Sequence, residues 1–249
     1  MSCHHGVCDR HGGVSPAPHR SLNLSFGVGD AVDNVRENRQ RLKAALGIPV
    51  LASASQVHGD AVWVIDEPLD RDTEQDGYDA LVTNQPGIGL LIQQADCQAI
   101  LLHDPVQKVV ANIHAGWRGS VAGIIGKTVR TMTARFGTRP GDLVAGISPS
   151  LGPCCAEFVD YRTELPVEMH GYQMAPNRFD FWAISRDQLQ ESGVRQERID
   201  SAAICTKCGS DYFSFRRERV TGRFGSVIML RTAIRCSSWT GCRPRPAMR

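Results

Sequence analysis

The sequence predicts one α+β domain built as a layered sandwich. Short β-type runs fill the centre of the chain, and they alternate irregularly with a few amphipathic helices. This irregular order argues against a doubly wound sheet, which needs regular βαβ alternation. A length of 249 residues suits one substantial core, and the sequence shows no internal repeat and no linker. We therefore expect a single domain over residues 1–231 and a poorly structured tail over residues 232–249.

The first quarter of the chain predicts an irregular entry, one helix and two strands. Residues 1–20 are rich in His, Gly and Pro, which favours irregular structure. Residues 33–46 carry apolar and small side chains at helical spacing and are followed by Gly47, a typical helix stop. Residues 49–57 and 61–65 then show β-type patterns.

The middle of the chain is strand-rich and is followed by a long amphipathic segment. Apolar runs separated by Gly, Pro and Asp predict strands over residues 81–83, 88–93, 99–102 and 109–114. The period then becomes helical over residues 119–136, where the apolar side chains share one face. Residues 143–148 return to a strand pattern.

The last part of the domain predicts one more helix and two strands. The helix covers residues 181–192 and ends at Gly193. The strands cover residues 199–205 and 224–231. From Thr232 onward the chain shows neither the helical nor the strand period, which predicts the loosely attached tail.

Composition and charge exclude several classes of partner. Hydrophobic residues make up 42% of the chain and charged residues 22%, as in ordinary globular proteins. A net charge of +2 is too small for a nucleic-acid or membrane field, and no apolar run is long enough to span a bilayer. The N-terminus lacks the apolar core of a signal peptide, and nine cysteines suggest free thiols or metal ligands. We expect a cytoplasmic protein.

Three short segments place metal-ligating side chains at the ends of predicted strands. They are Gln56-Val57-His58-Gly59, Ala95-Asp96-Cys97 and His114-Ala115-Gly116-Trp117-Arg118-Gly119. Two imidazoles and one thiolate give three protein ligands and leave a fourth tetrahedral position open, which is typical of catalytic zinc. The residues alone leave another interpretation open. Each histidine can be an ordinary core or surface residue, and Cys97 a small buried hydrophobe.

Arg118 and Trp117 lie beside the third segment, and each allows two interpretations. Arg118 is either a surface cation or a phosphate-binding residue that acts together with N–H groups at the start of the predicted helix. Trp117 is either a core residue or a platform for a purine ring, and the same alternatives hold for Phe136. The core interpretation is the simpler one for both aromatic residues.

The remaining cysteines and histidines receive structural interpretations. Cys205 and Cys208 have the spacing of half a zinc site, but the sequence shows no second pair at suitable spacing, so we interpret them as structural thiols. Cys154 and Cys155 belong to a Gly-Pro turn and are expected to pack or to line a pocket. The N-terminal group is rich in metal-ligating types but lies at a chain end, and we interpret it as adventitious: Cys3, His4, His5, Cys8 and His11.

Motifs spread over residues 7–230 resemble those of the laccase-domain family. These YfiH-like proteins were formerly described as multicopper polyphenol oxidases and are now regarded as purine nucleoside phosphorylases. The matching segments, besides the three above, are Arg10-His-Gly-Gly-Val-Ser15, Ser21-Leu-Asn-Leu24, Glu37-Asn-Arg39, Asp79-Ala-Leu-Val82, Gly152-Pro-Cys-Cys155 and Thr221-Gly-Arg223. The sequence departs from the usual family pattern at Asp9, Ser55, Gln94, Gln98 and Ala99, which leaves the substrate preference open.

The resemblance implies a fold, a cofactor and an activity. The fold is an α/β/β/α sandwich shared with certain Cys–His hydrolases. The family's metal and catalytic positions correspond to His58, Cys97 and His114, which would bind Zn²⁺, with copper possible in vitro. The implied substrates are purine nucleosides and phosphate, and we assign Arg118 to substrate binding. The implied activities are purine nucleoside phosphorylase, adenosine deaminase and methylthioadenosine phosphorylase.

Other functions remain open at this point. Cys with two His also matches a blue-copper ligand set, but a laccase needs many further histidines, and this chain has only eight and no His-x-His pair. Metal-free hydrolysis is another alternative, with Cys97 as nucleophile and His114 or His58 as base. The sequence neither supports nor excludes a non-catalytic role, and it leaves the oligomeric state and the preferred nucleoside undetermined.

Overall fold

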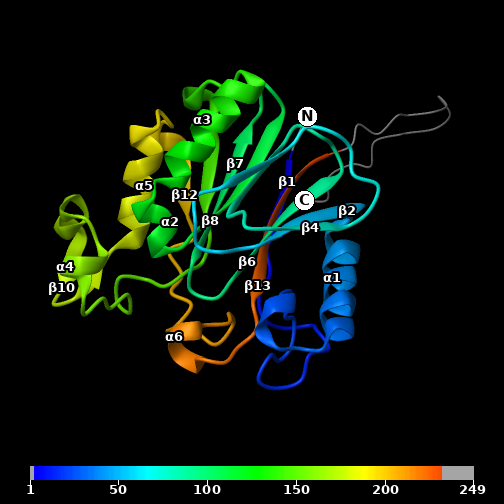
Figure 1. Cartoon of the computed structure of the whole chain (residues 1–249), viewed down its shortest axis with the longest axis horizontal. Helices are drawn as coiled ribbons and strands as arrows, with labels where there is room; N and C mark the ends of the chain where they lie inside the picture. The colour runs from blue at the N-terminus through cyan, green and yellow to red at the C-terminus, as the bar shows by residue number, and fades with distance from the viewer. Residues whose placement is uncertain (1–2, 232–249) are drawn as a thin grey trace, which may run out of the picture.

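The computed structural model describes residues 3–231, which form a helix–sheet–sheet–helix stack (Figure 1). The predicted tail over residues 232–249 lies outside the described residues. The strands are β1 (Cys3–Val7), β2 (Val50–Ser55), β3 (Val62–Ile65), β4 (Thr73–Asp76), β5 (Ala80–Thr83), β6 (Ile88–Gln94), β7 (Gln98–Asp104), β8 (Val109–Ala115), β9 (Val144–Ile147), β10 (Gln173–Ala175), β11 (Arg178–Phe179), β12 (Ile199–Ser201) and β13 (Phe224–Leu230). The α-helices are α1 (Val32–Leu46), α2 (Trp117–Val121), α3 (Ile124–Phe136), α4 (Tyr161–Glu164), α5 (Phe181–Glu191) and α6 (Phe215–Glu218).

Two mixed sheets make the inner layers of the stack. One has the strand order β1-β13-β6-β2-β4 and the other β12-β9-β7-β8-β5-β3. Side chains alternate between the two faces of each strand, so Leu90 and Ile92 of β6 face the second sheet while Leu91 faces the outside. Val110 of β8 and Leu101 of β7 complete the same inter-sheet core. Because both faces of β6 and β8 are covered, every residue of these two strands is buried and most of them are apolar.

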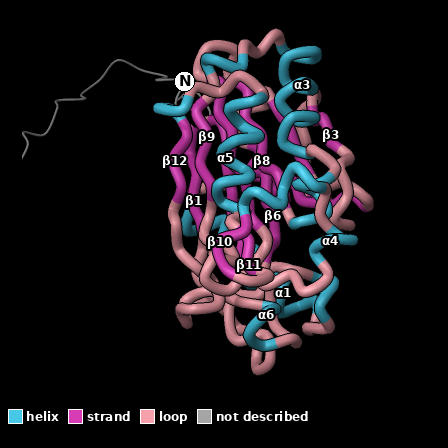
Figure 2. The backbone as a smooth tube through the Cα atoms, turned by 90° about the vertical axis from the view of Figure 1, so that its left-hand side faces the viewer, coloured by secondary structure: helices cyan, strands magenta, loops and turns pink. Residues whose placement is uncertain are grey.

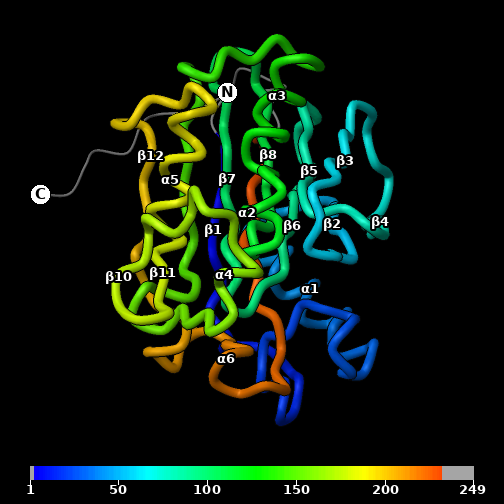
Figure 3. Tube along the Cα trace, turned by 60° about the vertical axis from the view of Figure 1, so that its left-hand side comes forward, coloured from blue at the N-terminus to red at the C-terminus, as the bar shows by residue number. Residues whose placement is uncertain are grey.

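Helices cover the outer face of each sheet. Leu42 of α1 packs on the first sheet beside Leu91, and Val129 of α3 and Leu189 of α5 pack on the second. Figure 2 shows α5 in front of the strands of the second sheet, and Figure 3 shows α3 beside it on the same face. The expected single-domain α/β/β/α sandwich is therefore confirmed. No helix within residues 3–231 has the length and apolar character needed to cross a membrane.

The prediction of one continuous helix over residues 119–136 is wrong. The segment forms two helices, and α2 begins already at Trp117 with Gly116 as its N-terminal cap. The break lies at Gly123, which has a φ of 72°, a left-handed conformation that ends one helix and that glycine adopts without a steric penalty. The apolar spacing continues through the break, which is why the pattern alone suggests a single helix.

The irregular entry predicted for residues 1–20 is also wrong at its start. Residues 3–7 form β1, which pairs antiparallel with β13 from Cys3 opposite Leu230 to Val7 opposite Ser226. A strand at a sheet edge is stabilised by its hydrogen bonds to the neighbouring strand. Its own sequence therefore does not need to show an alternating apolar pattern. The predicted strand over residues 199–205 is shorter than expected, because only β12 pairs, parallel to β9.

The strand connections bring three loops to one end of the sandwich. β2 and β6 are parallel neighbours, so both end on the same side. The chain leaves β6 through a short turn and enters β7, whose first residue, Gln98, pairs with Ala115 at the end of β8. The ends of β2, β6 and β8 therefore meet, and the three predicted ligand segments follow from these ends.

Candidate metal centre and its cavity

The first candidate ligand, His58, lies in the turn after β2. Its backbone φ is 61°, a left-handed conformation that few residues other than glycine adopt. The carboxylate of Asp79 holds this turn, because it accepts the three consecutive backbone N–H groups of residues 57–59, at 3.2, 2.9 and 2.7 Å. The His58 side chain is exposed at the surface of the turn. A buried carboxylate thus fixes the position from which this imidazole projects.

His114, near the end of β8, is oriented by the same carboxylate. Its side chain is almost fully buried, and its Nδ1 lies 2.8 Å from Oδ1 of Asp79. An ionised carboxylate only accepts hydrogen bonds, so Nδ1 carries the donated proton and Nε2 is left for another partner. The rings of His58 and His114 meet edge to face, with centroids 4.8 Å apart. Asp79 therefore positions both histidines, one through its backbone and the other through its ring.

Cys97 enters the same group from the turn between β6 and β7. Its Sγ lies 3.8 Å from Nε2 of His58, and the ligand atoms of all three candidate residues lie within 4.8 Å of one another. The preceding residue, Asp96, also has a positive φ, of 85°. The Asp96 carboxylate accepts hydrogen bonds from Oγ1 of Thr206 at 2.7 Å and from the backbone N–H of Arg216 at 2.6 Å. Asp96 thus anchors the turn that carries the thiol.

Mutual interactions shift the pKa values of these groups. Burial raises the pKa of the Cys97 thiol, but the charges and hydrogen bonds of His114 and His58 outweigh it and lower the pKa to about 6. Burial lowers the pKa of His114, but Cys97 and Asp79 outweigh it and raise the pKa to about 9. Burial also raises the pKa of Asp79, whereas the His114 hydrogen bond holds it below its usual value. Near neutral pH the metal-free group is a thiolate beside an imidazolium.

The space around the three side chains fits a metal ion. A Cβ atom at Gly116 would lie 3.0 Å from Sγ of Cys97 and 3.0 Å from Cδ2 of His58, so glycine leaves this space clear. Two imidazole nitrogens and one thiolate are ligands that zinc accepts, and three protein ligands leave a coordination position free. The same donor set also suits copper. A carboxylate that accepts a hydrogen bond from the other ring nitrogen of a ligating histidine, as Asp79 does from His114, is typical of protein metal sites.

The three side chains line a cavity of about 580 Å³. This volume lies within the range of small-molecule sites in proteins. Aromatic rings form part of the cavity wall, where Phe158 lies between Trp117 and Phe181 with ring centroids 6.1 and 5.1 Å away. The cavity therefore combines an apolar aromatic wall with a group of metal-ligating residues.

Four arginines line the same cavity: Arg118, Arg216, Arg219 and Arg223. Nη1 of Arg216 donates to the Glu157 carbonyl at 2.9 Å, and Nη1 of Arg223 donates to the Thr221 carbonyl at 2.9 Å. The guanidinium of Arg118 lies over the Trp117 ring, 4.2 Å from its centroid. Within residues 3–231 the guanidinium groups of Arg118 and Arg219 form no hydrogen bond and no ion pair. These two cations are available to an anionic ligand.

The structure brings His58, Cys97, His114 and Arg118 to the wall of one cavity. It places Arg118 inside the first turn of α2, a helix of 5 residues, and not ahead of a long helix. Trp117 lines the cavity, whereas Phe136 packs against the core beneath α3.

Sequence reasoning gave no role to Asp79 or to the arginines near the C-terminus. Their only signals were the motifs Asp79-Ala-Leu-Val82 and Thr221-Gly-Arg223, which contributed to the resemblance but carried no residue role.

Comparison with known proteins gives a consistent set of relatives. A family model described as "Multi-copper polyphenol oxidoreductase laccase" matches residues 4–231. The chain is 36% identical over 238 residues to a purine nucleoside phosphorylase of Streptomyces coelicolor, covering 91% of this chain and 95% of that protein. It is 34% identical over 234 residues to the purine nucleoside phosphorylase YfiH of Escherichia coli, covering 89% and 91%.

The fold has close counterparts among solved structures. YlmD from Geobacillus stearothermophilus superposes with a TM-score of 0.85 at 33% identity, covering 92% of each chain. The hypothetical protein YfiH of Bacillus licheniformis superposes with a TM-score of 0.84 at 29% identity, covering 92% of this chain and 93% of that one. The agreement extends over both sheets and their covering helices, because so little of either chain lies outside the match.

Proposed function

Because this chain belongs to the family described as multi-copper polyphenol oxidoreductase laccase, whose curated relatives include purine nucleoside phosphorylases, we propose that it phosphorolyses purine nucleosides with the help of zinc. The observation that carries the proposal is the group of His58, Cys97 and His114 in the wall of a cavity that also presents arginines and aromatic rings. We also propose a cytoplasmic location, which the free cysteines of the described residues favour.

His58, Cys97 and His114 would hold the ion, and Asp79 would keep both imidazoles turned toward it. Zinc bound there would supply Lewis acidity and an open coordination position. The Asp79 hydrogen bond keeps a proton on Nδ1 of His114, so Nε2 is the ring nitrogen that would bind the ion once its own proton has been displaced. Gly116 keeps the backbone of the β8–α2 connection clear of the group.

Phosphorolysis requires the cavity to hold two substrates in line. A phosphate oxygen attacks C1′ of the ribose, the bond from C1′ to N9 breaks, and its electron pair leaves with the purine base. Arg118 and Arg219 would bind the phosphate and neutralise its charge, because their guanidinium groups are not committed elsewhere in the described chain. The aromatic wall formed by Trp117 and Phe158 would contact the base and exclude water from it.

The proposal extends to two further reactions at the same site. Adenosine deaminase activity would use water in place of phosphate, which attacks C6 of the purine and releases ammonia to give inosine. Methylthioadenosine phosphorolysis would follow the same course as adenosine phosphorolysis, with a thioether at the 5′ position. Both reactions would depend on the same three ligand residues, because each needs an activated oxygen nucleophile next to the nucleoside.

One observation favours a second candidate, a metal-free hydrolase. The lowered pKa of Cys97, about 6, and the raised pKa of His114, about 9, describe the ion pair that cysteine hydrolases use. In such an enzyme the Cys97 thiolate would attack a carbonyl carbon. Metal content distinguishes the two candidates, because a thiolate that is a zinc ligand is not free to act as nucleophile.

The donor set fits copper, but polyphenol oxidation by a multicopper centre needs additional histidine clusters. Within residues 3–231, neither group of potential metal ligands contains more than two histidines. Copper binding at the same three side chains in vitro remains part of the proposal, without oxidase activity.

The test combines product analysis with metal analysis. Zinc-loaded protein should convert adenosine to adenine and ribose 1-phosphate when phosphate is present, and to inosine by deamination. His58→Ala, Cys97→Ser and His114→Ala should each lose one zinc per chain and both activities, whereas Cys8→Ser, outside the metal-ligating groups, should lose neither. A zinc-loaded wild type that converts no purine nucleoside, with or without phosphate, would overturn the proposal. Activity that persists without metal but depends on Cys97 would establish the hydrolase.

Arg118 provides a separate test of the phosphate site. Arg118→Ala should raise the KM for phosphate while zinc content and deamination stay unchanged, because deamination uses no phosphate. Steady-state kinetics at varied phosphate concentration measure this. An unchanged phosphate KM would show that Arg118 is only a surface cation stacked on Trp117.

A further inference from the structure

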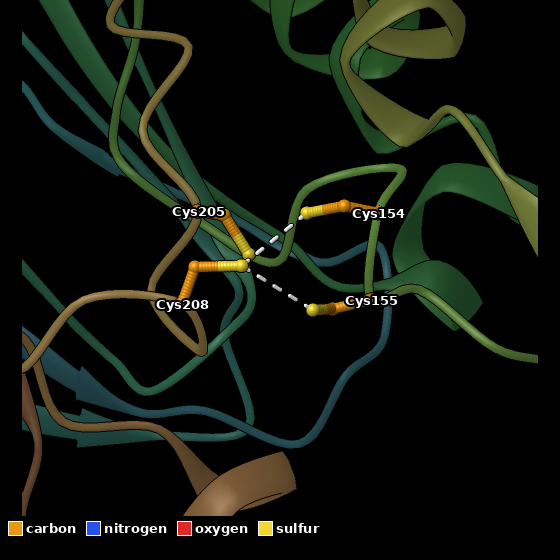
Figure 4. Close-up of side chains that lie close together, drawn as sticks. All are labelled: Cys154, Cys155, Cys205 and Cys208. Atoms are coloured by element: carbon orange, nitrogen blue, oxygen red, sulfur yellow. Dashed lines mark hydrogen bonds between the residues drawn. The ribbon is translucent and has the colours of Figure 1, made fainter.

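A second group of metal-ligating side chains lies outside the cavity. Cys154, Cys155, Cys205 and Cys208 come from two loops far apart in the sequence, and their sulfur atoms all lie within 4.8 Å of one another (Figure 4). Cys154 and Cys155 are each 3.5 Å from Cys208, measured between Sγ atoms. None of the four lines the cavity. The sequence analysis found no second pair for Cys205 and Cys208 and assigned Cys154 and Cys155 to packing or pocket lining, whereas the structure brings the two pairs together.

Local structure explains how each pair of thiols is presented. Cys154 and Cys155 occupy a tight turn in which the Cys155 N–H donates to the Gly152 carbonyl at 2.9 Å. Cys205 and Cys208 have the two-residue spacing of a metal-binding turn. Ser150 and Cys205 form an isolated parallel bridge, which brings the two loops together. The backbone of the two loops therefore places the two pairs of thiols opposite each other.

The distances fit one tetrahedral ion. A zinc–sulfur bond of about 2.3 Å places neighbouring sulfurs of a tetrahedron about 3.8 Å apart. The observed separations run from 3.5 Å to at most 4.8 Å and bracket this value. A disulfide would need about 2.05 Å between its sulfurs. All four residues are free thiols in the structure, and Cys154 and Cys208 are exposed.

The surroundings of the sulfurs are those of a metal-bound thiolate. The backbone N–H of Gly152 donates to Sγ of Cys205 at 3.3 Å, an interaction that stabilises negative charge on sulfur. A Cβ atom at Gly152 would lie 3.0 Å from Cβ of Cys205, so only glycine allows this approach. Lys207, between the two cysteines of the turn, and Arg216, whose Nη1 lies 3.4 Å from the Cys155 carbonyl, add positive charge. Four thiolates around a divalent ion carry a net charge of −2, which these cations offset.

We propose that Cys154, Cys155, Cys205 and Cys208 bind a structural zinc ion that is separate from the His58, Cys97 and His114 group. A fully protein-ligated tetrahedral site has no open position, so this ion serves structure and not catalysis. Its binding releases protons from the thiols and links the two loops covalently through the metal.

The two linked loops both contact the turn that carries Cys97. The backbone N–H of Leu151 donates to the Asp96 carbonyl at 2.8 Å, and Oγ1 of Thr206 donates to the Asp96 carboxylate at 2.7 Å. Leu151 and Arg216 also line the cavity. The structural ion would therefore hold one wall of the cavity and the position of the Cys97 turn.

The test is carried out in a Cys97→Ser background, so that zinc at the cavity does not interfere. This variant should retain one zinc per chain after dialysis, with four sulfur neighbours in its X-ray absorption spectrum. Adding Cys205→Ser and Cys208→Ser should remove that zinc, whereas adding Cys8→Ser, a thiol outside both groups, should not. Absence of zinc from the Cys97→Ser protein, or zinc that survives the two added substitutions, would overturn the proposal. Iron in place of zinc would overturn the identity of the ion.

A second measurement on the wild-type chain covers the case in which the combined variant does not fold. Peptide mapping after alkylation should show these four cysteines protected in zinc-loaded protein and alkylated once a chelator has removed the metal. A mass lower by two hydrogens for each bond, with linked peptides, would show disulfides instead and overturn the proposal. Neither measurement depends on nucleoside turnover, so the failure of this site and the failure of the proposed activity are distinguishable.

Discussion

Among the residues that would not touch the ion, Asp79 is the one on which we expect the cavity metal site to depend most. Its Oδ1 accepts the His58 N–H and Nδ1 of His114, and its Oδ2 accepts the N–H groups of residues 57 and 59. Asp79→Asn preserves the volume but keeps only one acceptor oxygen. Whichever way the amide lies, two of these four hydrogen bonds are lost.

The magnitude follows from the number of bonds. A hydrogen bond to a charged group contributes about 1.5–3 kcal/mol, so losing two should lower the free energy of unfolding by about 3–6 kcal/mol. Loss of the hydrogen-bond partner of a metal-ligating histidine lowers metal affinity by about 10–100-fold. Urea denaturation of metal-free protein measures the first effect. Competition with a zinc chelator measures the second effect. The affinity to follow is that of the cavity zinc, which is the ion that Cys97→Ser loses.

Asp104 provides the matched control for this substitution. It is also buried and lies at the far end of β7, where its Oδ1 accepts the N–H groups of Val106 and Gln107. Its Oδ2 has no hydrogen-bond partner among residues 3–231, so Asp104→Asn keeps both bonds and should leave zinc affinity unchanged. If folded Asp79→Asn binds zinc within twofold of wild type, Asp79 does not orient the ligands, and our account of the site is wrong.

Two further perturbations test the site and the fold. Gly116→Ala should weaken zinc binding with little loss of folding stability, because the new Cβ lies 3.0 Å from Cys97 Sγ. Gly146→Ala is the control in the same competition assay, because its new Cβ would meet no atom within 4 Å. Equal zinc affinities of the Gly116→Ala and Gly146→Ala proteins would contradict the role of Gly116. Burial raises the pKa of Glu74, but the Arg39 charge outweighs burial and holds this pKa below its usual value. The Glu74–Arg39 pair therefore stabilises the fold fully above about pH 4.5, and this stabilisation is lost as the pH falls through the lowered pKa. Glu74→Gln should therefore cost roughly 1.5–3 kcal/mol at pH 7, and its urea-denaturation curve should converge on the wild-type curve in acid; a difference independent of pH would refute the ionic explanation.

The parts of the fold that were predicted correctly have local signals. α1 and β6 to β8 carry periodic apolar patterns, because their buried faces are decided by neighbouring residues in the chain. The strand β4 was missed because its four residues are polar, and it exists because it pairs with β2. β1 was missed for the same reason. An edge strand depends on a partner that lies far away in the sequence, and a local pattern does not report it.

The residues of the candidate site also divide into those that have a local signal in the sequence and those that do not. His58, Cys97 and His114 were found because their residue types are unusual at strand ends and because the surrounding motifs resemble a known family. Asp79 was not singled out, since an aspartate before a strand is common and its role depends on contacts with residues 57–59 and 114. The four-cysteine group was not recognised because its two halves are far apart in the sequence and meet through contacts such as the bridge between Ser150 and Cys205.

The two proposed metal sites meet at one turn of the chain. Asp96 and Cys97 are consecutive residues, but Asp96 is held by the loops of the four-cysteine group, whereas Cys97 belongs to the cavity. The Asp96 carboxylate accepts hydrogen bonds from Oγ1 of Thr206 and from the backbone N–H of Arg216. Because Asp96 is hydrogen-bonded to both loops and directly precedes Cys97, the position of the loops fixes the position of the Cys97 thiolate. Loosening those loops by removing the structural ion should therefore reduce metal affinity at the cavity, even though no ligand there has changed.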